Sequence, residues 1–103
     1  MNTPYYLVDL LELAYRESKS AIGDKKARML ESIFYLCDQL QEYISPRVPD
    51  SYRSYAISSC SDFKSWAEEN FKSEGSYDAG VGMLEKHLFH IRMILGKTEE
   101  FCK

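Results

Sequence analysis

Apolar residues recur at steps of three and four along most of this chain of 103 residues. The most regular run lies within residues 24–44 and consists of Leu30, Ile33, Cys37, Leu40 and Ile44. Such steps place all of these side chains on one face of an α-helix. No segment of useful length alternates between apolar and polar residues, which is the pattern of a half-buried strand. The sequence therefore predicts an all-α fold.

Three further segments have the same helical period, and short connections rich in glycine, proline and serine separate them. Four helices of similar length with short connections favour an antiparallel, up-down four-helix bundle. We expect one domain over residues 1–103, because the chain is too short to divide. The apolar stripes of the three other helices contain Leu7, Leu11, Ala14, Ser18 and Ile22; Tyr52, Ala56, Cys60, Phe63, Ala67 and Phe71; and Val81, Leu84, Leu88, Ile91 and Leu95.

Residues that favour helix ends give the predicted boundaries. Thr3-Pro4 opens the first helix and Gly23 stops it, since glycine accepts a left-handed backbone conformation. Asp24 is expected to cap the second helix, which ends at Ser45-Pro46. The polar run at residues 58–62 weakens the third helix and allows a break near residue 60. Gly75 and Ser76 separate the last two helices, and Gly96 is expected to end the fourth.

Composition narrows the classes of function. The formal net charge of −3 argues against a broad electrostatic grip on nucleic acid. Three cysteines without a close Cys-x-x-Cys pair make a disulfide framework or a zinc site improbable. The first residues lack a basic start and a long apolar run, and no stretch approaches a membrane span of about 18 apolar residues. We therefore expect a cytoplasmic protein that binds neither nucleic acid nor membrane.

The chain offers little for catalysis. His87 and His90 are the only histidines and share one predicted helix, at a spacing that turns their rings about 60° apart. A metal site needs three or four converging ligands, which we cannot assemble around this pair. A nucleophile activated by histidine and an orienting acid is equally hard to build, and no phosphate-binding loop is present. We predict a non-catalytic protein without cofactor or metal.

One face of the second helix carries an acidic strip with an aromatic residue in its middle. Glu31, Tyr35, Asp38 and Glu42 follow one another at steps of four, three and four, opposite the core stripe. Such a strip is either a solvated helix face or a docking surface for a basic partner. In the second case the carboxylates would steer the encounter and Tyr35 would be an anchor.

Tyrosine is abundant, with 8 residues in the chain, whereas a helical core prefers leucine, isoleucine and alanine. Tyrosine combines a large contact area with a polar tip, which suits interfaces. Tyr52 and Tyr55 follow the stiff connector Pro46–Pro49 and are the best candidates for further exposed contacts.

The last helix is apolar on two sides. Phe89 and Met93 fall nearly opposite its core stripe, next to Lys86 and His90. Such a helix is either central in the core or presents its second side to a partner. A homodimer formed through Phe89 and Met93 is one such arrangement.

These features favour a protein-binding domain over an enzyme. The most specific hypothesis is a bacterial immunity protein that neutralises a nuclease-type toxin. Toxins that attack nucleic acid are basic, and an acidic inhibitor gains from opposite charge. Two alternatives are a self-associating structural or regulatory bundle and a phage- or plasmid-borne inhibitor of a host enzyme.

Overall fold

The computed structural model describes residues 3–18, 20–72 and 78–103, and for residues 70–72 and 78–82 it describes the backbone alone. The helices are α1 (Tyr5–Ser18), α2 (Asp24–Ile44), α3 (Asp50–Lys72) and α4 (Asp78–Phe101). A short 3-10 helix, η1 (Ser45–Arg47), follows α2 directly. The described residues contain no strand, so the all-α prediction is confirmed.

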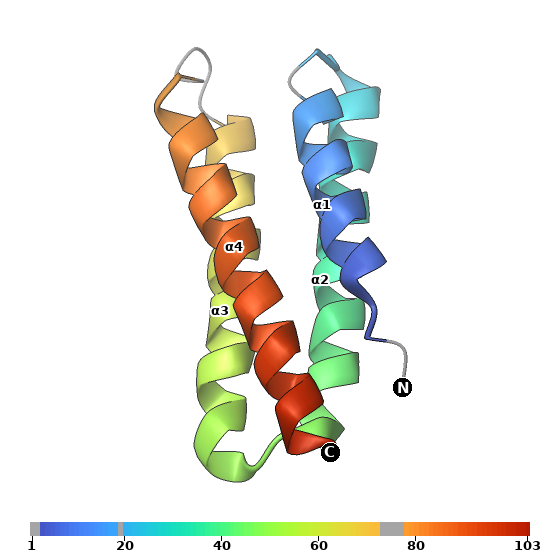
Figure 1. Ribbon diagram of the computed structural model, residues 1–103. Helices are drawn as coiled ribbons and strands as arrows, with labels where there is room; N and C mark the ends of the chain where they lie inside the picture. Colours follow the sequence, from blue (N-terminus) through green and yellow to red (C-terminus); the bar gives the residue numbers. More distant parts are fainter. Residues whose placement is uncertain (1–2, 19, 73–77) are drawn as a thin grey trace.

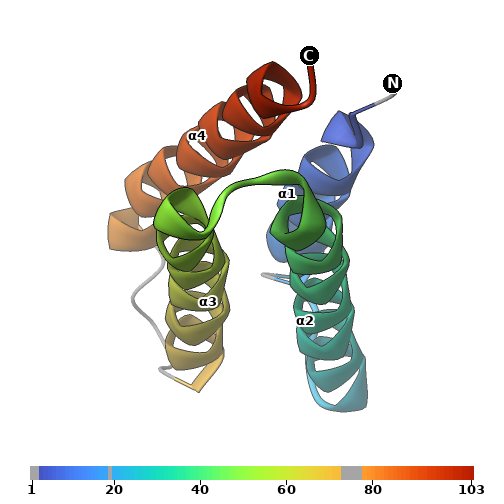
Figure 2. The ribbon, with the colours of Figure 1, turned by 90° about the horizontal axis from the view of Figure 1, so that it is seen from below.

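The helices form an up-and-down bundle (Figure 1). Each helix packs against the next one in the chain, and α4 closes the bundle by packing against α1. Seen from below, α4 runs at an angle to α2 and α3 and lies on the outside of the bundle (Figure 2). The predicted four-helix bundle is therefore confirmed.

The core is built from the predicted apolar stripes. All stripe residues with described side chains are buried except Ile22, Leu30 and Tyr52, and the last two still pack against the core. The stripe residues Phe71 and Val81 lie outside the described side chains. Further residues complete the core: Val8, Tyr15, Val48 and Ile94.

The connection between α1 and α2 differs from the prediction. α1 ends at Ser18, and Ile22 is 85% exposed, so Ile22 does not extend the stripe. Gly23 does adopt a positive φ of 64°, but it does so immediately before α2, where it occupies the capping position. Asp24 is the first residue of α2 and makes no capping hydrogen bond. Its carboxylate still lies in the first turn, where the helix dipole favours negative charge.

The break near residue 60 that the polar run allows does not occur, because α3 is continuous from Asp50 to Lys72. Ser59 donates its hydroxyl proton to the carbonyl oxygen of Tyr55 at 3.0 Å, so this serine is satisfied within the helix. Cys60 and Phe63 are fully buried in the core. Tertiary packing of these side chains therefore outweighs the weak helix preference of the polar run.

Gly96 does not end α4, which continues to Phe101. Thr98 is fully buried and donates its hydroxyl proton to the carbonyl oxygen of Ile94 at 2.8 Å. A side chain at Gly96 would approach the Tyr5 hydroxyl to 3.6 Å, an ordinary contact distance. The last turn of α4 is thus held against the start of α1, which keeps it helical beyond the glycine.

Ion pairs on the surface connect α4 to α1. Arg92 Nη2 lies 3.1 Å from Asp9 and 3.6 Å from Glu12. Glu12 also pairs with Arg16 at 3.0 Å, one turn further along α1. These contacts place α4 on one flank of α1, while α2 occupies the other.

Candidate functional site

The acidic strip lies along the outer side of α2, where Glu31, Tyr35, Asp38 and Glu42 all have exposed side chains. The Tyr35 side chain is 62% exposed. Within the described residues Glu31 and Glu42 make no ion pair, whereas Asp38 accepts a hydrogen bond of 2.9 Å from Lys64 Nζ of α3. Two of the three carboxylates are therefore available to a partner, and the third already has a counter-ion.

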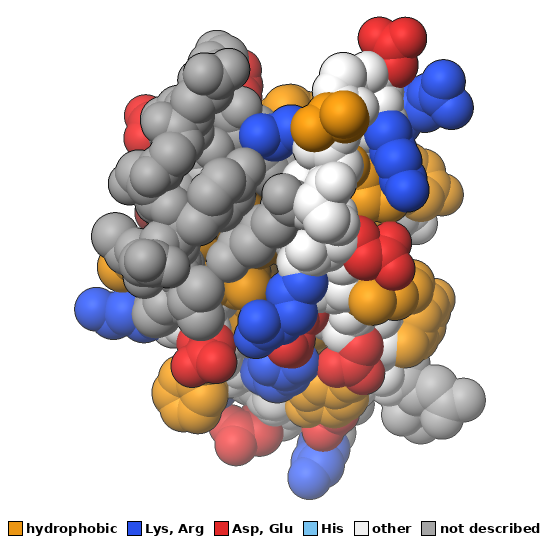
Figure 3. All heavy atoms as spheres, turned by 90° about the horizontal axis from the view of Figure 1, so that it is seen from above, with side chains coloured by type: hydrophobic (Ala, Val, Ile, Leu, Met, Phe, Trp, Pro, Cys, Tyr) orange, Lys and Arg blue, Asp and Glu red, His pale blue; other side chains and the backbone are white. Residues whose placement is uncertain are grey.

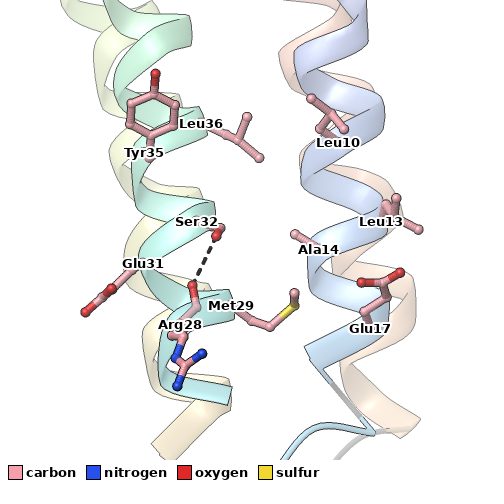
Figure 4. Close-up of a pocket in the computed structure, with 10 residues that line it drawn as sticks. All are labelled: Leu10, Leu13, Ala14, Glu17, Arg28, Met29, Glu31, Ser32, Tyr35 and Leu36. Carbon is pink, nitrogen blue, oxygen red and sulfur yellow. Dashed lines mark hydrogen bonds between the residues drawn. The ribbon is translucent and has the colours of Figure 1, made fainter. Parts of the chain in front are cut away.

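A groove of about 550 Å³ borders this strip and runs between α1 and α2 (Figure 4). Leu36 and Met29 point from α2 toward α1. The apolar part of the lining consists of Leu10, Leu13, Ala14, Met29 and Leu36. The polar part consists of Glu17, Arg28, Glu31, Ser32 and Tyr35. Two members of the predicted strip thus form one edge of an apolar groove.

The α1 side of this groove was not predicted, although the sequence contains a signal for it. Leu10 and Leu13 are 43% and 53% exposed, which is unusual for leucines of a small bundle. With Tyr6 and Glu17 they follow steps of four, three and four, in a second stripe beside the core stripe of α1. α1 is therefore apolar on two sides, as the sequence predicted for α4.

The other half of the strip has different surroundings. Asp38 and Glu42 line a hollow of about 470 Å³ at the junction of α2 and α3, together with Gln41, Ser45 and Ile57. Gln41 Nε2 donates to the carbonyl oxygen of Ile57 at 3.4 Å and to the hydroxyl of Ser61 at 3.2 Å. These hydrogen bonds join the two helices. The hollow is consequently a structural junction more than a binding groove.

Tyr52 and Tyr55 lie away from the acidic strip, on the flank of α3 that faces α4. The rings of Tyr52 and Tyr55 lie 5.5 Å apart, and Tyr52 also lies 5.5 Å from Phe101. The Tyr55 hydroxyl is hydrogen-bonded to His90 Nε2 of α4. Tyr52 is half-buried, whereas Tyr55 is exposed. The structure therefore divides the six predicted partner-binding residues between two surfaces.

Phe89 and Met93 lie on the outer side of α4, and their side chains are 64% and 60% exposed. Their neighbours on the opposite side of the helix, Leu84, Leu88 and Leu95, are fully or almost fully buried. Of the two readings of this helix, a central core position is excluded within the described residues. Phe89 and Met93 remain available for contact with another molecule.

His87 is half-buried and packs among aromatic rings of α3. Its ring centroid lies 5.2 Å from that of Trp66 and 5.7 Å from that of Phe63. Burial lowers the pKa of His87, and nearby His90 and Lys86 lower it further, while the negative charge of Asp62 opposes the shift. The half-buried position among these rings indicates a structural role for His87.

Acidification is expected to destabilise the fold through His87. Because its pKa is lower in the folded state, the unfolded chain binds the proton first as the pH falls through 6.5. The free energy of unfolding from urea titrations should therefore decline between about pH 7 and pH 5. For His87→Gln, this free energy should decline less steeply over the same range. Titration of the His87 ring by NMR gives the direct check. A midpoint at or above 6.5 would contradict the burial of its neutral form.

The two buried cysteines lack the low thiol pKa of a nucleophile. Burial raises the pKa of Cys37 to about 12 and that of Cys60 to about 11, so both thiols stay protonated at neutral pH. Cys102 is exposed in the last turn of the chain. Among the described residues, no group of three His, Cys, Asp or Glu side chains is arranged to hold a metal ion.

Charges of both signs are interspersed over the end of the bundle seen in Figure 3, with hydrophobic side chains between them. The described side chains of this face therefore form no continuous field of one sign. Within the described part of the chain, no helix has the length and apolarity needed to cross a membrane.

No family model, curated protein or solved structure matches this chain. Among the described residues, the groove between α1 and α2 combines an apolar lining, an exposed tyrosine and carboxylates without an ion pair.

Proposed function

We propose that this chain is a non-catalytic protein-binding domain that engages a basic protein through the groove between α1 and α2. In its most specific form the proposal is an immunity protein that neutralises a nuclease-type toxin. The interface would consist of the groove and the neighbouring strip residues Glu31, Tyr35 and Glu42.

The observation that carries the proposal is the arrangement of exposed leucines beside unpaired acids. Leu10 and Leu13 form an apolar centre that water contacts in the free protein. Glu17 and Glu31 stand on opposite edges of the groove, and within the described residues neither makes an ion pair. Protein interfaces commonly have this composition, with an apolar centre that supplies affinity and a charged rim.

The negative charge of the chain and of the acidic strip favours a basic partner. The chain has a net charge of −3, and two of the three strip carboxylates lack a counter-ion among the described residues. Opposite charge across an interface speeds the encounter and excludes acidic competitors. Arg28 also lines the groove, so the rim is not uniformly negative. A nuclease domain fits this pattern because it needs a basic surface to hold its own substrate.

The test is capture of the partner by the immobilised chain from extracts of the cells that encode it. We expect a basic protein to be retained by the wild type and lost with Leu13→Asp, which places a charge in the apolar groove. Ile22→Asp is the matched control, because Ile22 is 85% exposed and lies outside the groove lining. If the captured protein degrades nucleic acid, adding the purified chain should stop the reaction.

Two results would contradict the proposal. Equal retention by the wild type and Leu13→Asp would remove the groove from the interface. Retention of an acidic protein would contradict the expectation of a basic partner, even if that protein bound in the groove. Circular dichroism of each variant should first establish that the helices are intact, since exposed positions contribute little to stability.

A further inference from the structure

The outer side of α4 carries an ordered stripe that the proposed function does not use. Its members are exposed and follow one another at steps of three and four: Lys86, Phe89, Met93, Lys97 and Glu100. At about 100° per residue, all of them lie within about 40° of Met93 around the helix axis. Phe89 and Met93 thus form the apolar middle of a stripe that has charged ends.

The members of this stripe lie at equal distances on either side of Met93 along the sequence. The two end residues carry opposite charges. Lys86 lies seven residues before Met93, and Glu100 lies seven residues after it. Phe89 lies four residues before Met93, and Lys97 lies four residues after it. A two-fold axis through Met93 that pairs α4 with an antiparallel copy would therefore place each Lys86 opposite a Glu100 of the second copy.

We infer that two copies of this chain associate through α4 in this antiparallel arrangement, with Met93 at the two-fold axis. Each contact occurs twice in such a dimer, as an isologous interface requires. Phe89 of each copy lies opposite Lys97 of the other, whose ammonium group suits an aromatic face. Lys97 already lies 5.5 Å from the ring of Phe101 in its own helix.

Charge decides against a parallel pairing of the same helices. Parallel helices in register would bring each Lys86 against the other Lys86, and each Lys97 against the other Lys97, which is repulsive. Lys86 makes no ion pair within the described residues, while Glu100 pairs only with Lys97 on its own helix, at 3.2 Å. The antiparallel dimer supplies Lys86 with a carboxylate.

The position and size of the stripe define the kind of dimer. In Figure 2, α4 and α2 lie on different sides of α1. The groove is lined by α1 and α2, away from α4. The span from Lys86 to Glu100 is about 21 Å along the helix. Two helices that meet over this length bury less than the roughly 800 Å² per partner of stable complexes. We therefore expect a reversible dimer in the micromolar range, independent of the proposed partner.

Sedimentation equilibrium over a range of concentrations is the first test. The wild type should approach twice the chain mass of 12.0 kDa as concentration rises. Lys86→Glu or Glu100→Lys should each raise the dimer Kd about tenfold, because attraction becomes repulsion at two symmetric places. The double variant Lys86→Glu/Glu100→Lys should restore the wild-type Kd. Met93→Asp should give a monomer with unchanged helix content.

Cysteine cross-linking tests the position of the axis. In a Cys102→Ser background, mild oxidation of Met93→Cys should yield a covalent dimer, because the axis brings the two positions within disulfide reach. Met83→Cys is the matched control, since Met83 is also exposed but lies about 15 Å along α4 from the axis. It should yield no covalent dimer under the same conditions.

Three outcomes would overturn the inference. The first is a monomer at every concentration. The second is a dimer that the single reversals do not weaken or the double variant does not restore. The third is a Met93→Asp variant that loses the captured partner of the proposed function, which would assign α4 to that interface. Leu13→Asp should abolish partner capture without affecting the dimer. Each proposal can therefore fail without the other.

Discussion

Leu40→Ala is expected to lower the free energy of unfolding by about 2–5 kcal/mol. Leu40 is fully buried in α2 and belongs to the most regular stripe of the chain. Truncation removes apolar contacts and leaves a cavity that the packed helices around it fill only in part. Urea denaturation of the purified protein, followed by circular dichroism at several protein concentrations, measures the difference.

Leu13→Ala is the matched control for this prediction. Leu13 is the same residue type, but 53% of its side chain is exposed, so truncation removes few buried contacts. We expect a loss below about 1 kcal/mol. A loss for Leu13→Ala as large as that for Leu40→Ala would mean that Leu13 is covered in solution, for example by association through the groove. A negligible loss for Leu40→Ala would instead reverse the assignment of the α2 faces.

The core was predictable because it depends on a local repeat. Ile33, Cys37 and Ile44 are buried wherever α2 docks, since their spacing alone brings them to one face. Helix ends were less predictable because local preference competes with packing there. Ser59 satisfies its hydroxyl inside α3, and Thr98 is held in the core beyond Gly96, so both helices continue where the local sequence favours an end.

The candidate site was only partly predictable, since it depends on how helices meet. Exposure of Glu31 and Tyr35 follows from the period of α2 and was foreseen. The groove beside them also requires the second apolar stripe of α1 to lie next to α2, which no single helix encodes. The ion pair between Asp38 and Lys64 depends likewise on the register of α2 against α3. Sequence patterns therefore predict which residues share a helix face, whereas the packing of the helices determines which residues of other helices they contact.

The same limit explains why the predicted tyrosines separated. Tyr52 and Tyr55 are close to the end of α2 along the chain, and both were predicted to offer further exposed contacts beside the proline connector. The corner between α2 and α3 turns them toward α4 instead. Arg53 holds that corner by donating to the carbonyl oxygens of Ser45 at 2.7 Å and Val48 at 2.8 Å. Their surface thus adjoins α4, through Phe101 and His90, and not the groove.

Charge and packing should contribute differently to binding of the captured partner. The double reversal Glu31→Lys/Glu42→Lys is expected to weaken affinity by about 2–4 kcal/mol, because like charges would face each other across the interface. Neither carboxylate has an ion pair within the described residues, so helix content and melting should change little. Much of the loss should appear in the association rate and shrink at high salt. Surface plasmon resonance at two ionic strengths measures both effects.

Tyr35→Ala is expected to act on the dissociation rate instead. The Tyr35 ring borders the groove and is 62% exposed, so a partner would bury it as an anchor. Loss of such an anchor costs about 2 kcal/mol or more, speeds dissociation and depends little on salt. Tyr55→Ala is the matched control, since Tyr55 is also exposed but lies beside His90 on the other surface. If Tyr55→Ala weakens binding and Tyr35→Ala does not, the partner binds beside α4, and the groove is only a solvated face.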